Sequence, residues 1–152
     1  MIGDWIDKVE YPQLPAMTDA ELTAFLDQAQ FARLGTLNAD GSIHIAPIFF
    51  KHEDGQILMA TQCPSRKLRN IQRIPNVTVL IDKTDVPFKG VLIYGTAELD
   101  YEDVIAKRMR IFKKRLNTED ARTYATRLSA KWDCAIIRIT PTRIVSFDYA
   151  KG

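Results

Sequence analysis

Cysteine is scarce in this chain, and neither sign of charge is in clear excess. Only two of the 152 residues are cysteines, Cys63 and Cys134, and they form no CxxC pair. We therefore expect reduced thiols in a cytoplasmic protein, since a disulfide framework would need more cysteines. The 21 basic and 19 acidic residues give a net charge of +2. This balance provides no reason to expect nucleic acid or an anionic membrane as a partner.

Long hydrophobic runs are also missing. The longest wholly apolar run, IAPIFF at 45–50, is far too short to span a bilayer. The first dozen residues carry acidic side chains and lack an apolar h-region, so no signal peptide is expected. With 46% hydrophobic residues, the chain is predicted to form one domain over residues 1–152, with residues 1–15 as an N-terminal arm.

The familiar catalytic motifs do not occur. The sequence contains no G-x-S-x-G, H-E-x-x-H or P-loop pattern, which argues against the common hydrolases and nucleoside triphosphatases. His44 and His52 have no cysteine or carboxylate at ligand spacing, so we expect no metal site. Cys63 has no base paired with it and is not expected to act as a nucleophile. No residue is therefore assigned a catalytic role.

The first half of the chain predicts a helix followed by strands. Thr18 and Glu21 form a capping box, which predicts a helix from there to about Gln30. Three β-rich runs follow, ARLGTLN, SIHIAPIFF and QILMAT, separated by NADG and HEDG. An Asp-Gly pair is typical of a tight hairpin turn, because glycine accepts a positive φ. Residues 32–61 are therefore predicted to form a three-stranded antiparallel meander.

The second half predicts a short helix from Ser65 to about Arg73, ended by Pro75, and then strands at 77–82 and 90–99. Residues 101–117 predict a helix whose cations face solvent, followed by helical residues 118–130. Pro141 divides the last β-like stretch into two runs. About six to seven mostly antiparallel strands without βαβ alternation predict a mainly-β fold, a closed or nearly closed barrel with peripheral helices.

The stretch TQCPSRKLRN, residues 61–70, is the best candidate for a binding site. Thr61 and Ser65 offer hydroxyl groups, and Ser65 occupies a helix N-cap position. Arg66 and Lys67 then fall in the first turn, where the helix dipole disfavours cations unless an anion binds there. A phosphate would relieve this conflict. From charge alone, a solvated basic helix start is the more usual explanation, because charge runs on short helices commonly face solvent.

The ordered set of motifs resembles a known family. A capped helix is followed by RLGTLNADG, HIAPIFF, TQCPSRKLRNI, NVTVLID and GVLIYGTAEL. Over about residues 18–149 this order is similar to the pyridoxamine 5′-phosphate oxidase-like proteins, the FMN-binding split β-barrel family. The resemblance implies a split β-barrel of Greek-key-like topology and a homodimer that binds FMN at the subunit interface.

The resemblance also implies which residues hold the cofactor. Arg66 and Lys67 would bind the FMN phosphate, beside Thr61, Gln62 and Ser65. The backbone of a second segment would lie along the flavin ring, namely Ala46, Pro47, Ile48 and Phe49. Trp132 and Phe147 are candidates for contact with the ring, and both could equally pack in the core or a dimer interface. Pro47 fits a bulge or an edge strand as well as the family role.

Two departures from the family argue against a true pyridoxamine phosphate oxidase. The Arg/His-containing segment that holds pyridoxal phosphate in those enzymes has no counterpart before Gly152, and a flavin-contacting glutamine falls near Gly90. We therefore expect an FMN-dependent oxidoreductase that acts on an unidentified small molecule. The alternatives are a deazaflavin-dependent reductase and a non-catalytic flavin- or haem-binding protein.

Overall fold

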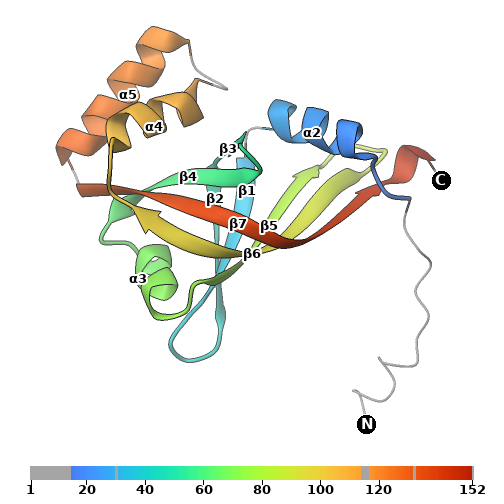
Figure 1. The fold of residues 1–152 in the computed structure, drawn as a ribbon, viewed down its shortest axis with the longest axis horizontal. Coiled ribbons are helices and arrows are strands. Elements are labelled where there is room, and N and C mark those ends of the chain that lie inside the picture. The colour runs from blue at the N-terminus through green and yellow to red at the C-terminus, as the bar shows by residue number, and fades with distance from the viewer. Residues whose placement is uncertain (1–14, 30, 114–116, 132, 152) are drawn as a thin grey trace.

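The computed structural model describes residues 15–29, 31–113, 117–131 and 133–151. Among them, seven antiparallel strands form one sheet that curls into a half-barrel, with helices around it (Figure 1). The strands are β1 (Phe31–Leu37), β2 (Ile43–Phe49), β3 (Lys51–Glu53), β4 (Gln56–Cys63), β5 (Asn76–Lys83), β6 (Lys89–Asp100) and β7 (Asp133–Asp148). The helices are α2 (Asp19–Gln28), α3 (Arg66–Arg73), α4 (Val104–Phe112), α5 (Thr118–Lys131) and the 3-10 turn η1 (Tyr149–Lys151). The predicted mainly-β fold is confirmed.

The strand order explains how the sheet curls. It runs β2-β1-β5-β6-β7-β4-β3, so β2 and β3 stand at opposite ends of the sheet. These two strands are nevertheless consecutive in the chain, joined only through the fully buried Phe50. The expected three-stranded meander is therefore wrong in one respect. Two hairpins form, β1 with β2 and the short β3 with β4. In the sheet order, however, β2 and β4 are not neighbours, as the meander would require.

The interior of the half-barrel is filled by alternate residues of the central strands. On β1 and β5 every second side chain is buried, which is the period expected of a strand with one face on the core. The main core cluster includes Leu34, Val79, Ile81, Val91 and Ile93. A smaller cluster lies under α4 and α5, and it contains Leu58, Ile111, Phe112, Ala121 and Ile136.

The last strand is longer than predicted. The sequence predicts two β-runs divided at Pro141, whereas β7 is a continuous strand of 16 residues. The register along β6 shifts between Tyr94 and Gly95, and Pro141 pairs with Gly95 at that shift. The missing proline N–H group thus falls at a bulge, where a regular ladder hydrogen bond is not formed.

Gly95 is required for this close passage of the two strands. A Cβ atom there would lie 2.7 Å from the carbonyl oxygen of Thr140 and 2.9 Å from Ile139. We expect Gly95→Ala to lower the free energy of unfolding by about 1–3 kcal/mol, because backbone atoms must move apart. Gly35→Ala is the control, since its nearest backbone contact would be 3.4 Å. Urea denaturation of both variants checks this, and equal stabilities would contradict it.

Helix α2 begins as the sequence predicts. The Thr18 hydroxyl accepts a hydrogen bond from the Glu21 backbone N–H, and the Glu21 carboxylate accepts one from the Thr18 backbone N–H, which completes the capping box. Its start is tied to the C-terminal segment, because Met17 N donates to Ser146 Oγ and Lys151 bonds Glu21. Figure 1 shows α2 at one end of the sheet and α4 with α5 at the other. None of the described helices is long and apolar enough to cross a membrane.

The cations of α4 do not all face solvent, contrary to expectation. Lys107 bonds Asp100 at 2.6 Å, and Arg110 makes a two-point contact with Glu53. Arg108 is buried, with 2% of its surface exposed. The uniform solvated face inferred from charge is therefore wrong for the most buried of these residues.

Candidate functional site

One pocket collects most of the residues that the resemblance singles out. It has a volume of about 280 Å³ and lies between the ends of β2 and β4, the start of α3 and the second half of α4. Six of the predicted residues line it, namely Pro47, Ile48, Phe49, Thr61, Gln62 and Lys67. The other residues that line it are Phe31, Ala60, Arg108 and Phe112. We refer to this set as the Lys67 pocket.

The local sequence builds the polar side of the Lys67 pocket. Strand β4 ends at Cys63, Pro64 follows, and α3 then begins with Ser65 as its N-cap. The Ser65 hydroxyl accepts a hydrogen bond from Leu68 N at 3.3 Å and lies 3.1 Å from the hydroxyl of Thr61. The predicted capped helix is confirmed. It directs Lys67 toward the pocket that Thr61 also lines.

Lys67 has an unusual electrostatic environment. Its side chain is half-buried, and desolvation lowers the pKa of its ammonium group below the usual value of 10.5. None of the residues that line the pocket is an aspartate or glutamate. A cation removed from water without a carboxylate beside it is costly, and an anionic ligand would offset that cost.

Arg108 brings a second cation to the same pocket, and the sequence interpretation missed it. Its Nη2 donates to the carbonyl oxygen of Thr61 at 3.3 Å, and its guanidinium lies 5.7 Å from the centre of the Phe112 ring. A signal was present in the sequence. Arg108 lies four residues after Val104 and four before Phe112, so it shares the row of the apolar residues on α4.

Aromatic rings form the apolar side of the pocket. The rings of Phe31 and Phe49 stack at 4.4 Å with an interplanar angle of 28°. Phe112 meets Phe49 edge-on at 5.5 Å. The pocket thus combines an apolar aromatic wall with the Thr61 hydroxyl, the Gln62 amide and two cations, a composition suited to a planar ligand that carries a phosphate.

Pro47 is placed in an edge strand. It pairs with Arg33 of β1, and β2 is the outermost strand at its end of the sheet. A proline is tolerated in an edge strand because one side of that strand forms no ladder. Of the two structural alternatives for Pro47, the edge position is therefore correct.

Comparison with known proteins identifies the family of this chain. The family model described as pyridoxamine 5′-phosphate oxidase matches residues 18–147. The chain belongs to this family. A comparison with curated proteins finds no match.

Solved structures of low sequence identity share the fold of this pyridoxamine 5′-phosphate oxidase family member. A conserved hypothetical protein from Mycobacterium tuberculosis is 23% identical with a TM-score of 0.80, and the match covers 95% of this chain and 92% of that one. An F420 reductase is 19% identical with a TM-score of 0.64, covering 80% and 94%. A haem storage protein from Vibrio cholerae is 15% identical with a TM-score of 0.67, covering 90% and 96%.

The remaining predicted residues of this family member lie outside the Lys67 pocket. Ser65 and Arg66 line a second, neighbouring pocket of about 440 Å³ together with Ala39, Pro64, Arg69, Asn70 and Arg73. Ala46 is half-buried in β2 and lines neither pocket. Trp132 lies outside the described residues. The binding roles of all these residues stay predictions.

Phe147 stands far from the Lys67 pocket of its own chain. In the β7 pairing, Ala135 lies opposite Thr61, whereas Phe147 lies opposite Gly90. Twelve residues of strand separate these positions, roughly 40 Å at the usual rise. Phe147 instead contacts Tyr149, with ring centres 5.9 Å apart.

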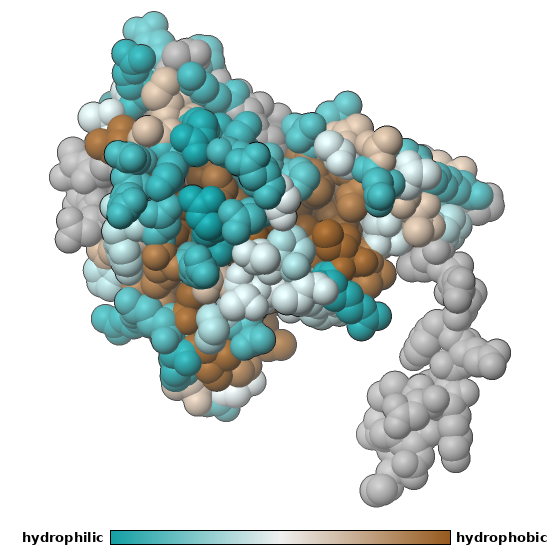
Figure 2. All heavy atoms as spheres, in the orientation of Figure 1, coloured by the Kyte–Doolittle hydropathy of each residue, from teal (hydrophilic) through white to brown (hydrophobic). Residues whose placement is uncertain are grey.

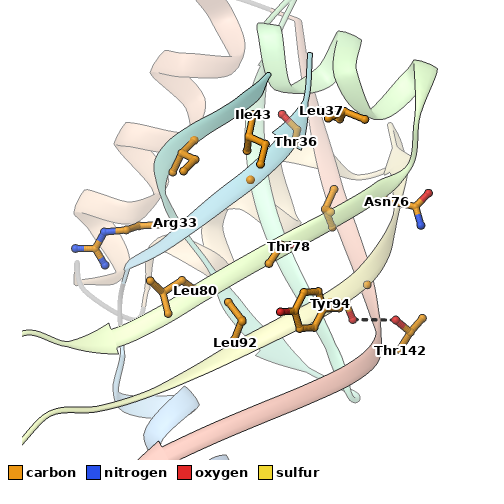
Figure 3. Close-up of a pocket in the computed structure, with 14 residues that line it drawn as sticks. Arg33, Thr36, Leu37, Ile43, Asn76, Thr78, Leu80, Leu92, Tyr94 and Thr142 are labelled. Atoms are coloured by element: carbon orange, nitrogen blue, oxygen red, sulfur yellow. Dashed lines mark hydrogen bonds between the residues drawn. The ribbon is translucent and has the colours of Figure 1, made fainter. Parts of the chain in front are cut away.

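A third and larger hollow lies on the outer face of the sheet. It has a volume of about 540 Å³ and is lined mostly by residues of β1, β2, β5 and β6, many of them partly or fully exposed. Figure 3 shows Leu80, Leu92 and Tyr94 projecting from β5 and β6 into it. Ile43 and Ile45 are 67% and 64% exposed. Figure 2 shows hydrophobic surface at the bottom of the view, where Figure 1, in the same orientation, draws the β1–β2 hairpin. We refer to this surface as the outer face.

Proposed function

We propose that this protein binds FMN in the Lys67 pocket and acts as a flavin-dependent oxidoreductase on a small molecule. The observation that carries the proposal is the half-buried ammonium group of Lys67, whose pKa is lowered by desolvation in a pocket lined by no carboxylate. The membership of the chain in the pyridoxamine 5′-phosphate oxidase family supports the same cofactor class.

The residues of the pocket fit the two parts of this cofactor. Lys67 would neutralise the phosphate, with the Thr61 hydroxyl as a further donor. The stacked rings of Phe31 and Phe49 would provide an apolar surface beside the ring system. When bound, the isoalloxazine ring supplies hydride-transfer chemistry, while the protein anchors, orients and shields it. Arg108 holds the end of β4 through the carbonyl of Thr61 and keeps that segment in position.

The proposal includes a homodimer formed through the outer face. A pocket of about 280 Å³ is at the lower limit of the volumes usual for small-molecule sites, so one chain offers only part of the enclosure that FMN needs. The exposed Ile43 and Ile45 supply apolar surface that a second copy would cover. Phe147 is too far along β7 to reach the Lys67 pocket of its own chain, and we propose that it contributes to the pocket of the partner.

The small molecule released from the purified protein tests this proposal. We expect heat-denatured protein to release FMN, identified by its absorbance spectrum and by mass spectrometry. If the protein is purified empty, added FMN is expected to bind with a dissociation constant in the micromolar range or below, measured by quenching of flavin fluorescence. Release of haem, or failure of FMN to bind the empty protein, would contradict the proposal.

A deazaflavin cofactor is the second candidate. Two observations favour it: one structural neighbour is an F420 reductase, and the arginine-rich pocket beside Ser65 could accommodate further negative charge. Parallel titrations of the empty protein with FMN and with a deazaflavin cofactor distinguish the two. Tighter binding of the deazaflavin by tenfold or more would replace FMN in the proposal.

A further inference from the structure

Exposed aromatic side chains gather at the end of the sheet where β7 stops. Phe88 and Tyr149 are both 48% exposed, and Val86, two residues before Phe88, is 78% exposed. The rings of Phe88 and Tyr149 meet edge-on at 6.4 Å, and Phe147 lies 5.9 Å from Tyr149. Figure 1 shows this end of β7, followed by η1, at the same end of the sheet as the connection between β5 and β6. We refer to Val86, Phe88, Phe147 and Tyr149 as the aromatic corner.

Paired backbone holds the aromatic corner in place. Tyr149 N donates to the carbonyl oxygen of Phe88 at 2.9 Å, and β6 and β7 remain paired up to Lys89 and Asp148. The rings are therefore presented to solvent by the end of a strand pair. Apolar side chains that stay exposed together on a fixed surface commonly mark a contact site.

The described part of the chain begins beside this corner. Asp148 N donates to the carbonyl oxygen of Pro15 at 2.8 Å, and Asp148 directly precedes Tyr149. Lys151 Nζ donates to the carbonyl oxygen of Ala16 at 3.0 Å. Pro15 and Ala16 are thus fixed to the end of β7, and the fourteen residues that precede them are attached to the molecule at the aromatic corner.

The sequence of residues 1–14, MIGDWIDKVEYPQL, suits an apolar surface. Ile2, Trp5, Ile6 and Val9 recur at the spacing i, i+3, i+4, i+7, which is typical of one apolar helix face. The charged residues of the segment occupy the positions between them. A short amphipathic segment is only marginally stable by itself in water, and packing of its apolar face supplies most of its stability.

The point of attachment favours the aromatic corner over other apolar surfaces. Trp5 lies ten residues before Pro15, so its reach is at most about 35 Å. Ile43 and Ile45 of the outer face belong to β2, which is four places from β7 in the sheet, roughly 19 Å away across the strands. A tethered segment has its highest effective concentration near its point of attachment, and the aromatic corner is the surface found there.

We propose that residues 2–9 dock on the aromatic corner of their own chain, with the Trp5 ring against Phe88. Aromatic pairs in edge-on or offset geometry are favourable beyond the area that they bury. Docking would remove from water the rings that the end of β7 otherwise exposes. The inference goes beyond the proposed function, which gives residues 1–14 no role, and it does not depend on a bound flavin.

Trypsin cleavage of the full chain, freed of cofactor, tests the proposal. Lys8 is the only lysine or arginine among residues 1–14, so early loss of residues 1–8 is read directly from the intact mass. Cleavage there requires the segment to leave its binding surface, so the rate follows the undocked fraction. We expect Phe88→Ala to raise this rate by about tenfold or more, because most of the burial of one aromatic side chain is lost.

Tyr101→Ala is the matched control. Tyr101 is an exposed ring, 57% accessible, that follows the opposite end of β6, so its removal should leave the rate of cleavage at Lys8 unchanged. Trp5→Ala makes the corresponding change on the segment itself, and we expect it to accelerate cleavage about as much as Phe88→Ala does. The double variant should be no faster than either, because the contact is already lost. Cleavage of synthetic peptides of residues 1–14 corrects for any change in the intrinsic rate.

Equal rates in Phe88→Ala and Tyr101→Ala would overturn the proposal. Accelerations by Phe88→Ala and Trp5→Ala that add in full would also overturn it, because the segment would then bind elsewhere. A wild-type rate that rises on dilution of the protein would show that a second copy covers the segment and would refute docking within one chain. All these rates are measured without cofactor, so a failure of FMN to bind would refute the proposed flavin function alone.

Discussion

Replacement of Lys67 by methionine is expected to weaken FMN binding by up to about a hundredfold. A charge-assisted hydrogen bond to a phosphate contributes roughly 1.5–3 kcal/mol, which corresponds to a ten- to hundredfold change in the dissociation constant. Methionine keeps the length and apolar stem of the side chain, so the fold should survive. Fluorescence titration of the empty variant with FMN measures the effect.

Two further variants give this test its reference points. Arg66→Met removes the neighbouring cation, which lines the second pocket of about 440 Å³ beside Ser65 instead, and we expect a smaller loss of FMN affinity. Arg122→Met removes an exposed charge of α5 and should leave the affinity unchanged within about twofold. If Lys67→Met binds FMN as tightly as Arg122→Met does, the assignment of the phosphate to Lys67 is wrong.

The same substitution should alter how stability depends on pH. Desolvation holds the pKa of Lys67 in the folded protein below its usual value of 10.5. In the pH range just below 10.5 the unfolded chain therefore binds more protons at this residue than the folded chain does. The free energy of unfolding of the empty wild-type protein therefore increases as pH rises through this range. At neutral pH Lys67 is charged in both states, so its titration does not change the stability there.

Methionine does not titrate, so the Lys67→Met variant does not show this increase with pH. It also avoids the free-energy cost of keeping a cation half-buried. We expect it to be more stable than the empty wild type at neutral pH, with a difference that shrinks as pH approaches 10.5. Urea denaturation of both proteins at several pH values measures the difference. A difference that stays constant with pH would contradict the inference that Lys67 is desolvated.

Local signals in the sequence predicted the elements of this fold well. The capping box at Thr18 and the N-cap at Ser65 are both present. The Asp-Gly turns also form, with positive φ values at Gly41, Asp54 and Gly55. Each of these features depends on residues within a few positions of one another, so a single sequence contains all the information that they require.

Long-range pairing could not be predicted in the same way. Alternation tells which face of a strand is buried, but it does not identify the neighbouring strand. The sequence therefore places β2 next to β4, whereas β4 pairs with β7, whose residues lie seventy or more positions later in the chain. For the same reason Pro141 suggests a break. Only its partner Gly95, at a register shift of β6, allows the strand to continue.

The candidate site shows the same contrast between residues close in sequence, which could be predicted, and distant residues, which could not. Lys67, Thr61 and Gln62 are close in sequence and were predicted to act together, and they line one pocket. Arg108 comes from a helix more than forty residues later, and its charge led to its placement on a solvated face. Burial of a cation depends on tertiary packing, here on the ring of Phe112 and the carbonyl of Thr61.

A glutamate at position 45 is expected to convert the proposed dimer into monomers. Ile45 is 64% exposed and lies on the outer face, which in a two-fold symmetric dimer presents each residue twice. Full burial of an isoleucine side chain contributes about 1.5–3 kcal/mol, so two copies account for roughly 3–6 kcal/mol. The dimer dissociation constant should therefore rise at least about a hundredfold, and an unpaired buried carboxylate would add to this.

The matched control is Ile105→Glu. Ile105 is 47% exposed but lies on α4, away from the outer face, so the same change of side chain should leave the dimer intact. Size-exclusion chromatography with light scattering gives the mass of each variant. A dimeric Ile45→Glu protein would show that the outer face is not the interface.

The affinity of the monomeric variant for FMN tests the second half of the dimer proposal. If Phe147 of the partner subunit completes the Lys67 pocket, Ile45→Glu must lose FMN affinity together with its partner, although every residue of the Lys67 pocket is unchanged. Phe147→Ala should then weaken FMN binding in a protein that remains dimeric. A monomer with the full affinity of the wild type would mean that one chain holds the whole site. Phe147 would in that case serve the packing of β7 against Tyr149 at the far end of the sheet.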